Sequence, residues 1–203
     1  DNSIKILLDN LKADHTIGVI GPNLINADSN PTHSFRRAGD GIITELNFSL
    51  FGLPYKALYG NNFEFNHSGK QIDVAYSCGA AMMMKRETFE KVGGFDESFF
   101  MYYEDQDLCN RIKKTGLRIV NEPSAIIQHL EGTSISLNSR REKYIIQSRK
   151  KYFLKTMPKW HFRVANILTK FFLLIGEFTY TLCGKKELAE KYSCRRNLIA
   201  EYE

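Results

Sequence analysis

The stretch Glu104-Asp105-Gln106-Asp107 concentrates three carboxylates, side chains that can accept a proton as a general base. We expect the stretch to open a helix, where neighbouring side chains point about 100° apart. Glu104 and Asp105 therefore cannot both face one substrate. Asp107 has the i,i+4 spacing to pair with Arg111. The alternative for Asp105 is an ordinary first-turn carboxylate that the helix dipole stabilises.

The helices and strands that must position these carboxylates can be predicted from the sequence, and together they indicate an α/β domain. Ser3, followed by apolar residues at helical spacing, predicts a helix over 4–13 with Ser3 as its N-cap. The apolar run 17–25, bounded by turn formers, predicts a buried strand of a mostly parallel sheet. Residues 26–71 lack sustained periodicity and predict a long excursion with short helical pieces around 42–51.

Regular patterns of apolar residues return after this irregular segment. Residues 74–84 predict one strand with Gly79 at its middle, where a glycine allows close backbone approach. The remaining predicted elements are a helix over 86–92, a helix from near 102 to 116, and two short strands over 117–120 and 124–129, separated by Glu122-Pro123.

Charge divides the chain. Residues 1–139 carry 13 basic and 17 acidic side chains, whereas 140–163 carry nine basic residues and one acidic residue. From residue 140 on we expect only helices, with Pro158 breaking the first run. The apolar stretch 164–183 contains a lysine and a glutamate, which favours an amphipathic or in-plane helix over a membrane span.

The basic segment also carries aromatic side chains. Lys150, Lys151, Lys155 and Trp160 form the mixture of cations and aromatics that suits an anionic membrane surface. The alternative is a solvated helical hairpin that packs on the preceding domain. No zinc-finger or RNA-recognition signature accompanies the segment, so we expect no nucleic-acid partner.

Composition excludes several classes of protein. The chain has 203 residues, of which 43% are hydrophobic and 25% charged, so it can bury a core and is not disordered. Its four cysteines show no C-x-x-C spacing, which argues against a disulfide scaffold or a zinc ribbon and suits a reducing compartment. The opening at Asp1 has neither a signal peptide nor an initiator Met, so we expect a piece of a longer protein.

A series of motifs follows in a fixed order between residues 77 and 134. They are a small-Gly-Ala-aliphatic stretch from Cys78, Arg86-Glu87, Gly93-Gly94-Phe95-Asp96-Glu97, Phe99-Phe100-Met101-Tyr102-Tyr103-Glu104-Asp105-Gln106-Asp107-Leu108, and a basic-Gly turn before a strand that ends in His129. In this order the chain resembles the C-terminal halves of family 2 glycosyltransferases, especially the rhamnosyltransferase-like members that build bacterial surface polysaccharides.

The resemblance covers roughly residues 1–139. It implies the C-terminal portion of a GT-A fold over 1–139, with 140–203 as an α-helical extension. It also implies an inverting transfer in which Asp105 is the general base, because the attacking hydroxyl needs a carboxylate within ~3 Å to accept its proton. Glu104 receives a supporting role, accepting hydrogen bonds from the acceptor or the backbone.

Four further residues are candidates for acceptor binding. The resemblance allows Gly79 and Ala80 to form an acceptor-facing wall, although they could simply permit close packing. Arg36 and Arg37, in the long excursion, could meet a diphosphate or a lipid-linked acceptor. A solvated pair of loop residues is the alternative for the two arginines.

The resemblance also implies a metal. Family members place a histidine after the last core strand, often as a ligand to Mg²⁺ or Mn²⁺, and His129 occupies that position. Its alternative is a structural histidine at a strand end. Most of the affinity would come from a strand-terminal Asp-x-Asp, since hard cations prefer carboxylates. No such motif precedes Ile4, and Asp105-Gln106-Asp107 lies within a predicted helix.

The leading hypothesis is therefore part of an inverting glycosyltransferase that lacks its nucleotide-binding half and is inactive alone. In the complete protein it would move a sugar from a nucleotide-sugar donor to a glycan or lipid-linked acceptor. We expect a cytoplasmic location, with the alternative of peripheral attachment to the inner face of the cell membrane. The competing hypothesis is a non-catalytic glycan- or membrane-docking module, which an upstream Asp-x-Asp would argue against.

Overall fold

The computed structural model describes residues 2–39, 44, 47, 53–130 and 139–202. Contacts between residues group the chain into two compact units. The sheet unit consists of Asp1–Gly39, Lys56–Ser98 and Glu104–Ser136, and the helical unit of Asp40–Tyr55, Phe99–Tyr103 and Leu137–Glu203. The division at 139/140 that the sequence suggests for two domains stays a prediction.

The main sheet has three strands in the order β1-β5-β3. The long strands β1 (Ile17–Ile25) and β5 (Arg118–Gln128) run parallel, and the short β3 (Ile72–Asp73) pairs antiparallel with β5. The predicted strand over 17–25 is confirmed. Eight of its nine residues are buried, which explains its continuous apolar run.

The two short strands predicted around Glu122-Pro123 are in fact one strand, β5. The register against β1 jumps at this point, because Pro22 pairs with Glu122 while the next residue, Asn23, pairs with Ile126. A bulge at this point accommodates Pro123, which has no backbone N–H to donate to the hydrogen bonds between the strands. The Glu122 carboxylate closes the bulge by accepting hydrogen bonds from the backbone N–H and hydroxyl of Ser124 at 3.0 and 2.6 Å.

The single strand predicted over 74–84 is also wrong. Its first part forms β4 (Tyr76–Ser77), which pairs antiparallel with β2 (Phe35–Arg36) in a separate two-stranded sheet. Gly79 and Ala80 then lie in a turn, and Met83 bridges Ile20 of β1. The glycine therefore marks a change of direction rather than the middle of a strand.

Three helices of the sheet unit match their predicted positions: α1 (Ser3–Ala13), α4 (Arg86–Lys91) and α5 (Glu104–Lys113). Ser3 is not the N-cap of α1, because Asn2 takes that position. Instead the Ser3 hydroxyl donates to the carbonyl of Ile126 at 2.8 Å and accepts from its N–H at 3.2 Å, which ties α1 to β5.

The helical pieces predicted around 42–51 lie mostly outside the described residues. Beyond them, α3 (Leu53–Tyr59) and the 3-10 turn η1 (Gly60–Asn62) were not anticipated from the sequence.

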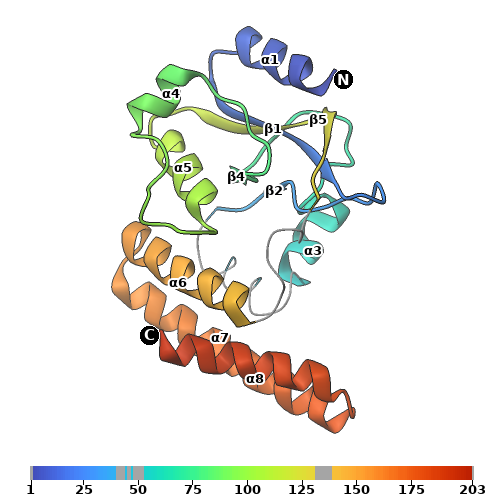
Figure 1. The fold of residues 1–203 in the computed structure, drawn as a ribbon, viewed down its shortest axis with the longest axis vertical. Helices are drawn as coiled ribbons and strands as arrows, with labels where there is room; N and C mark the ends of the chain where they lie inside the picture. Colours follow the sequence, from blue (N-terminus) through green and yellow to red (C-terminus); the bar gives the residue numbers. More distant parts are fainter. Residues whose placement is uncertain (1, 40–43, 45–46, 48–52, 131–138, 203) are drawn as a thin grey trace. The chain divides into compact units, whose positions relative to one another are not determined.

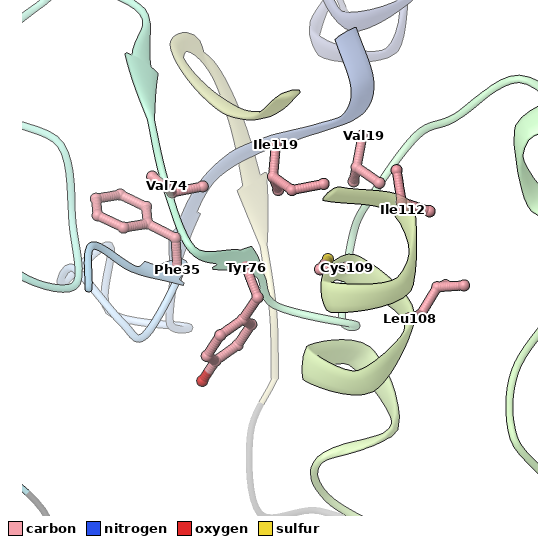
Figure 2. Packing of buried hydrophobic residues seen from close by; sticks show 8 residues of the cluster. All are labelled: Val19, Phe35, Val74, Tyr76, Leu108, Cys109, Ile112 and Ile119. Carbon is pink, nitrogen blue, oxygen red and sulfur yellow. The ribbon is translucent and has the colours of Figure 1, made fainter. Parts of the chain in front are cut away.

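Neighbouring residues of β1 and β5 point to opposite faces of the sheet. On one face, Val19 and Ile119 pack with residues of α5, as Figure 2 shows, and on the other face Ile20 and Val120 pack with α1. Figure 1 shows these two helices on opposite sides of β1 and β5. The mixed α/β class predicted from the sequence is confirmed in this arrangement. The core on the α5 side of the sheet continues through Val74, which follows β3, to Phe35 of β2 and Tyr76 of β4.

The helical unit contains α6 (Ser139–Thr156), α7 (Lys159–Leu182) and α8 (Lys186–Glu201). Pro158 precedes α7 as its N-cap residue, which confirms the predicted break. Helices α7 and α8 pack side by side (Figure 1). A side chain at Gly176 of α7 would clash with the ring of Tyr192 in α8. Among the described residues, no helix combines the length and apolar character needed to cross a bilayer.

Candidate active site

The carboxylate of Asp105 is held by two backbone N–H groups. One oxygen accepts a hydrogen bond from Gly79 at 2.9 Å, and the other accepts from Gln106 at 2.7 Å. The bond from Gly79 joins residues 26 positions apart and fixes the turn after β4 against the first turn of α5. Each carboxylate oxygen has a second lone pair, so Asp105 can still accept a proton from a bound hydroxyl.

Gly79 and Asp105 are in close contact. A Cβ atom built at Gly79 would lie 3.3 Å from the Cβ of Asp105, which is tighter than ordinary van der Waals contact. The absence of a side chain at Gly79 therefore lets its N–H reach the carboxylate. Gly79 and its neighbour Ala80 are both exposed, so an incoming molecule can reach this turn.

Two tyrosines with unusual backbone conformations precede the carboxylates. Tyr102 and Tyr103 have φ angles of +66° and +68°, a left-handed conformation that costs a residue with a side chain roughly 1–2 kcal/mol. They turn the chain sharply into Glu104, the first residue of α5. Strain of this kind persists where the surrounding structure holds it, and such residues cluster at functional sites.

Glu104 differs from Asp105 in its surroundings. Its Oε2 atom is buried and makes no hydrogen bond to any described residue. Burial raises the pKa of Glu104 above its ordinary value, and the neighbouring charge of Asp105 raises it further. A carboxyl group in this state can hold a proton or accept a hydrogen bond from a ligand.

Asp107 has a structural environment. It is 1% exposed, and its carboxylate accepts a hydrogen bond from Arg111 at 2.8 Å, as the i,i+4 spacing predicts. Arg111 also donates to the carbonyl of Val92, just after α4, at 2.6 Å. The pair thus connects α5 to the end of α4. Asp105-Gln106-Asp107 lies in a helix, as expected.

Arg36 reaches the same region from β2. Its guanidinium lies 5.2 Å from the centre of the Tyr76 ring and donates to Gln106 Oε1 at 3.4 Å, one residue from Asp105. The Tyr76 hydroxyl is hydrogen-bonded to His33 Nε2 at 2.7 Å. Arg36, Gly79 and Asp105, all named from the sequence, are therefore gathered in one region.

Sequence reasoning missed Tyr76, Gln106 and His33. Gln106 could have been suspected from its place between two acidic residues, but Tyr76 and His33 carry no signal of their own. Arg37 lies apart from Arg36, because its guanidinium is 5.3 Å from the centre of the Tyr59 ring. Arg36 is the last residue of β2 and Arg37 lies in the bend that follows, so the two guanidinium groups contact different aromatic rings.

His129 follows β5, where its backbone N–H donates to the carbonyl of Ile25 at 2.8 Å. Within the part of the chain that the structure describes, no three His, Cys, Asp or Glu side chains come together as a metal site. These residues alone do not fit a Mg²⁺ or Mn²⁺ ion, which needs several oxygen ligands. The metal role of His129 stays a prediction.

Cys109 is a packing residue. It is fully buried in the core of the sheet unit, and burial raises the pKa of its thiol to about 12. A thiol in this state does not ionise near neutral pH, so Cys109 cannot serve as a nucleophile.

The four residues predicted to contact a membrane lie on two helices. Lys150, Lys151 and Lys155 belong to α6, and the ammonium groups of Lys151 and Lys155 each lie 5.6 Å from the centre of the Phe99 ring. Trp160 lies in the first turn of α7 and is 61% exposed. The lysines and the tryptophan therefore belong to different helices.

Comparison with known proteins identifies the chemistry of similar chains. The family model described as the N-terminal domain of galactosyltransferase matches residues 61–132. This range contains Tyr76, Gly79, Asp105 and His129, and it ends just after β5.

Curated relatives point the same way. An N-acetylglucosaminyl-diphospho-decaprenol L-rhamnosyltransferase of Mycobacterium tuberculosis is 45% identical over 56 residues, 28% of this chain and 18% of the relative. A low-salt glycan biosynthesis hexosyltransferase of Haloferax volcanii is 29% identical over 101 residues, 50% of this chain and 29% of the relative. A rhamnosyltransferase of Escherichia coli K12 is 39% identical over 51 residues, 25% of this chain and 19% of the relative.

Each match covers less than a third of the relative's own length. The resemblance to rhamnosyltransferase-like glycosyltransferases, drawn from the motifs between residues 77 and 134, is confirmed.

Proposed function

Because residues 61–132 are similar to glycosyltransferases, we propose that this chain is the acceptor-binding and base-carrying portion of a family 2 glycosyltransferase with a GT-A fold. The complete protein transfers a sugar, with inversion, from a nucleotide-sugar donor to a hydroxyl of a glycan or lipid-linked acceptor. The nucleotide-binding portion lies outside this chain, and the chain alone is inactive.

One observation carries the proposal: the hydrogen bond from Gly79 N–H to Asp105. It joins the Gly-Ala motif to the Glu-Asp motif, which are distant in the sequence. It also fixes the direction of a carboxylate that is only half-buried and therefore open to a substrate. Such positioning is what general-base catalysis requires.

The reaction then follows from Asp105. The acceptor hydroxyl gives its proton to the Asp105 carboxylate while its oxygen forms a bond to the anomeric carbon of the donor sugar. The bond between that carbon and the diphosphate oxygen breaks, and the nucleoside diphosphate leaves with the electron pair. Attack from the face opposite the leaving group inverts the anomeric carbon.

Neighbouring residues assist at this site. Arg36, held between the Tyr76 ring and Gln106, offers a guanidinium that suits a phosphate of a lipid-linked acceptor. Glu104 keeps the supporting role that the resemblance implies, with a carboxyl group whose Oε2 is buried and makes no hydrogen bond to a described residue. The exposed Gly79-Ala80 turn forms a wall beside the acceptor.

Location follows from the acceptor. We infer that the complete protein is cytoplasmic and acts in bacterial surface polysaccharide synthesis. A lipid-linked acceptor lies in a bilayer, so transfer to that class of acceptor takes place at the inner face of the cell membrane. We expect no nucleic-acid partner.

The test is Asp105→Asn in the complete protein, with transfer measured as nucleoside diphosphate release. We expect turnover to fall by about 10²–10⁴-fold, because the amide cannot accept the proton, while the donor Kd is nearly unchanged. The matched control is Glu97→Gln, which removes one exposed carboxylate eight positions away and should leave turnover within about twofold. Undiminished transfer by Asp105→Asn would remove Asp105 from the base role.

A further inference from the structure

Helix α7 exposes a continuous apolar face. Seven exposed side chains recur along it at helical spacing: Trp160, Val164, Ile167, Phe171, Leu174, Phe178 and Leu182. At 3.6 residues per turn they fall, together with the exposed Ile175, within an arc of about 100°. We call these eight residues the α7 stripe. It is about 33 Å long at 1.5 Å per residue.

The opposite face of α7 forms the core of the helical unit. Phe162 packs with Tyr152 and Phe153 of α6, and Leu173 packs with Ile146 of α6 and Ile199 of α8. Because the buried face already supplies the apolar contacts that hold the three helices together, the α7 stripe is surplus to the folding of this unit. A soluble helix would normally carry charged and polar side chains there.

Charge indicates what covers the stripe. The eight stripe positions contain no charged residue, and helical periodicity places Lys159, Arg163 and Lys170 along one edge of it. Residues 140–203 carry 15 basic and six acidic side chains, a net charge of +9. Glu177, the single acidic residue of α7, is paired with Arg196 of α8 at 3.0 Å.

This charge distribution disfavours a second copy of the chain as the occupant, since two surfaces of the same sign would repel. It favours an anionic lipid surface, which attracts basic side chains and accepts apolar ones at the boundary of headgroups and acyl chains.

We propose that α7 lies in the plane of an anionic membrane surface, with the α7 stripe inserted and Arg163 and its basic neighbours against the lipid phosphates. Trp160, at the N-terminal end of the stripe, has the amphipathic ring that favours the membrane interface. The proposal assigns the membrane contact chiefly to α7, whereas the sequence placed three of four contacts on α6. It deepens the membrane location proposed above.

The first experiment is partitioning of the chain onto phosphatidylcholine vesicles with and without phosphatidylglycerol. We expect binding to the anionic vesicles that weakens as salt is added. Trp160 is the one tryptophan of the chain, so its emission reports directly on the stripe. We expect a blue shift on binding, and stronger quenching by lipids brominated near the headgroup than by lipids brominated deep in the chain, because the helix inserts only about 5–10 Å.

Variants identify the surface. Ile167→Glu should lower partitioning at least about tenfold, because it removes apolar contact and adds a negative charge. The matched control is Ile4→Glu on α1, where the isoleucine is 63% exposed compared with 62% for Ile167, and it should change partitioning by less than about twofold. Arg163→Gln should weaken binding to anionic vesicles about fivefold and leave binding to neutral vesicles unchanged.

Circular dichroism and urea unfolding of each variant establish that it is folded. The proposal is overturned if the chain does not bind anionic vesicles, or if Ile4→Glu weakens binding as much as Ile167→Glu. It is also overturned if Ile167→Glu instead abolishes a concentration-dependent dimer, which would assign the stripe to a second copy. Vesicle binding is measured without turnover, so its failure would leave the transferase proposal intact.

Discussion

Asp105 and Asp107 lie two residues apart at the start of α5, yet their side chains have different surroundings. Asp105 is half-buried and accepts two backbone N–H groups, whereas Asp107 is 1% exposed and pairs with Arg111. Two positions on a helix differ by about 200°, so one carboxylate faces the exposed turn at Gly79 and the other faces the core. Periodicity alone separates these two aspartates.

Glu104 provides a prediction at this scale, because its pKa is raised in the folded protein from the ordinary value of 4.5. The folded state then holds the proton more tightly than the unfolded state, so the stabilising contribution is present below pH 4.5 and is lost as pH rises through the raised pKa. The side chain of the Glu104→Gln variant cannot ionise, so this variant does not lose stability in this way as pH rises. We expect the stability of the wild-type protein relative to Glu104→Gln to fall as pH rises through that window.

Urea unfolding at a series of pH values measures this difference. Glu97→Gln, which removes an exposed carboxylate, is the control for a general charge effect. Parallel stability curves for the wild type and Glu104→Gln would contradict the prediction.

At the scale of elements, hydrogen bonds from side chains, rather than backbone hydrogen bonds between strands, join several segments of the sheet unit. Asn66 donates to Asn121 of β5 at 2.9 Å, and Asn121 in turn donates to the carbonyl of Pro22 in β1 at 2.9 Å. Asn23 donates to the carbonyl of Asn66, also at 2.9 Å. Because all three amides are buried, each hydrogen bond avoids the cost of an unsatisfied polar group. The chain around Asn66 is thereby attached to both long strands.

The link between α4 and α5 gives the prediction at this scale. Asp107→Ala leaves Arg111, whose side chain is 22% exposed, without its carboxylate in a largely buried position. We expect a loss of about 2–3 kcal/mol in the free energy of unfolding, which is below the range for fully buried pairs because Arg111 is partly exposed. Chemical denaturation of the purified chain measures it.

The matched control is Glu90→Ala in α4. Glu90 also pairs with an arginine at i,i+4, but the two side chains are 65% and 86% exposed and 4.0 Å apart. Exposed pairs of this kind contribute little, so the expected loss is below about 0.5 kcal/mol. An equal effect of the two substitutions would mean that burial does not govern the contribution of the Asp107–Arg111 pair.

At the scale of the whole molecule, the number of charged residues in a segment does not tell how many of them lie at the surface. The basic segment 140–163 contains Arg149, which is 1% exposed and donates to Asn166 Oδ1 at 2.7 Å. Its guanidinium lies 5.3 Å from the centre of the Phe153 ring and 5.5 Å from that of Phe162. Arg149 is therefore a core residue of the helical unit, although in the sequence it is indistinguishable from its basic neighbours.

Arg149→Ala should lower the stability of the helical unit by about 2–4 kcal/mol, because it opens a cavity among aromatic rings and removes the donor to a buried amide. Arg140→Ala, at an exposed position of the same helix, should change stability by less than about 0.5 kcal/mol. Thermal unfolding followed by circular dichroism compares the two. Equal effects would show that Arg149 contributes only through the net charge of the segment.

The sequence by itself was enough for the features that depend on local periodicity. Each of these patterns lies within a few helical turns or a single strand. They were enough to place α1, β1, α4 and α5, the break at Pro158 and the Asp107–Arg111 pair. The motifs between residues 77 and 134 were enough for the glycosyltransferase resemblance.

Tertiary structure decided the features that join distant segments. The bulge that makes β5 one strand, the turn that carries Gly79 to Asp105, the separation of Arg36 from Arg37 and the burial of Arg149 all depend on partners far away in the chain. The exposed stripe of α7 was equally hidden, because an apolar run does not reveal which side its neighbours cover. Local patterns record only the preferences of nearby residues, whereas burial and long-range hydrogen bonds arise when separate segments pack together.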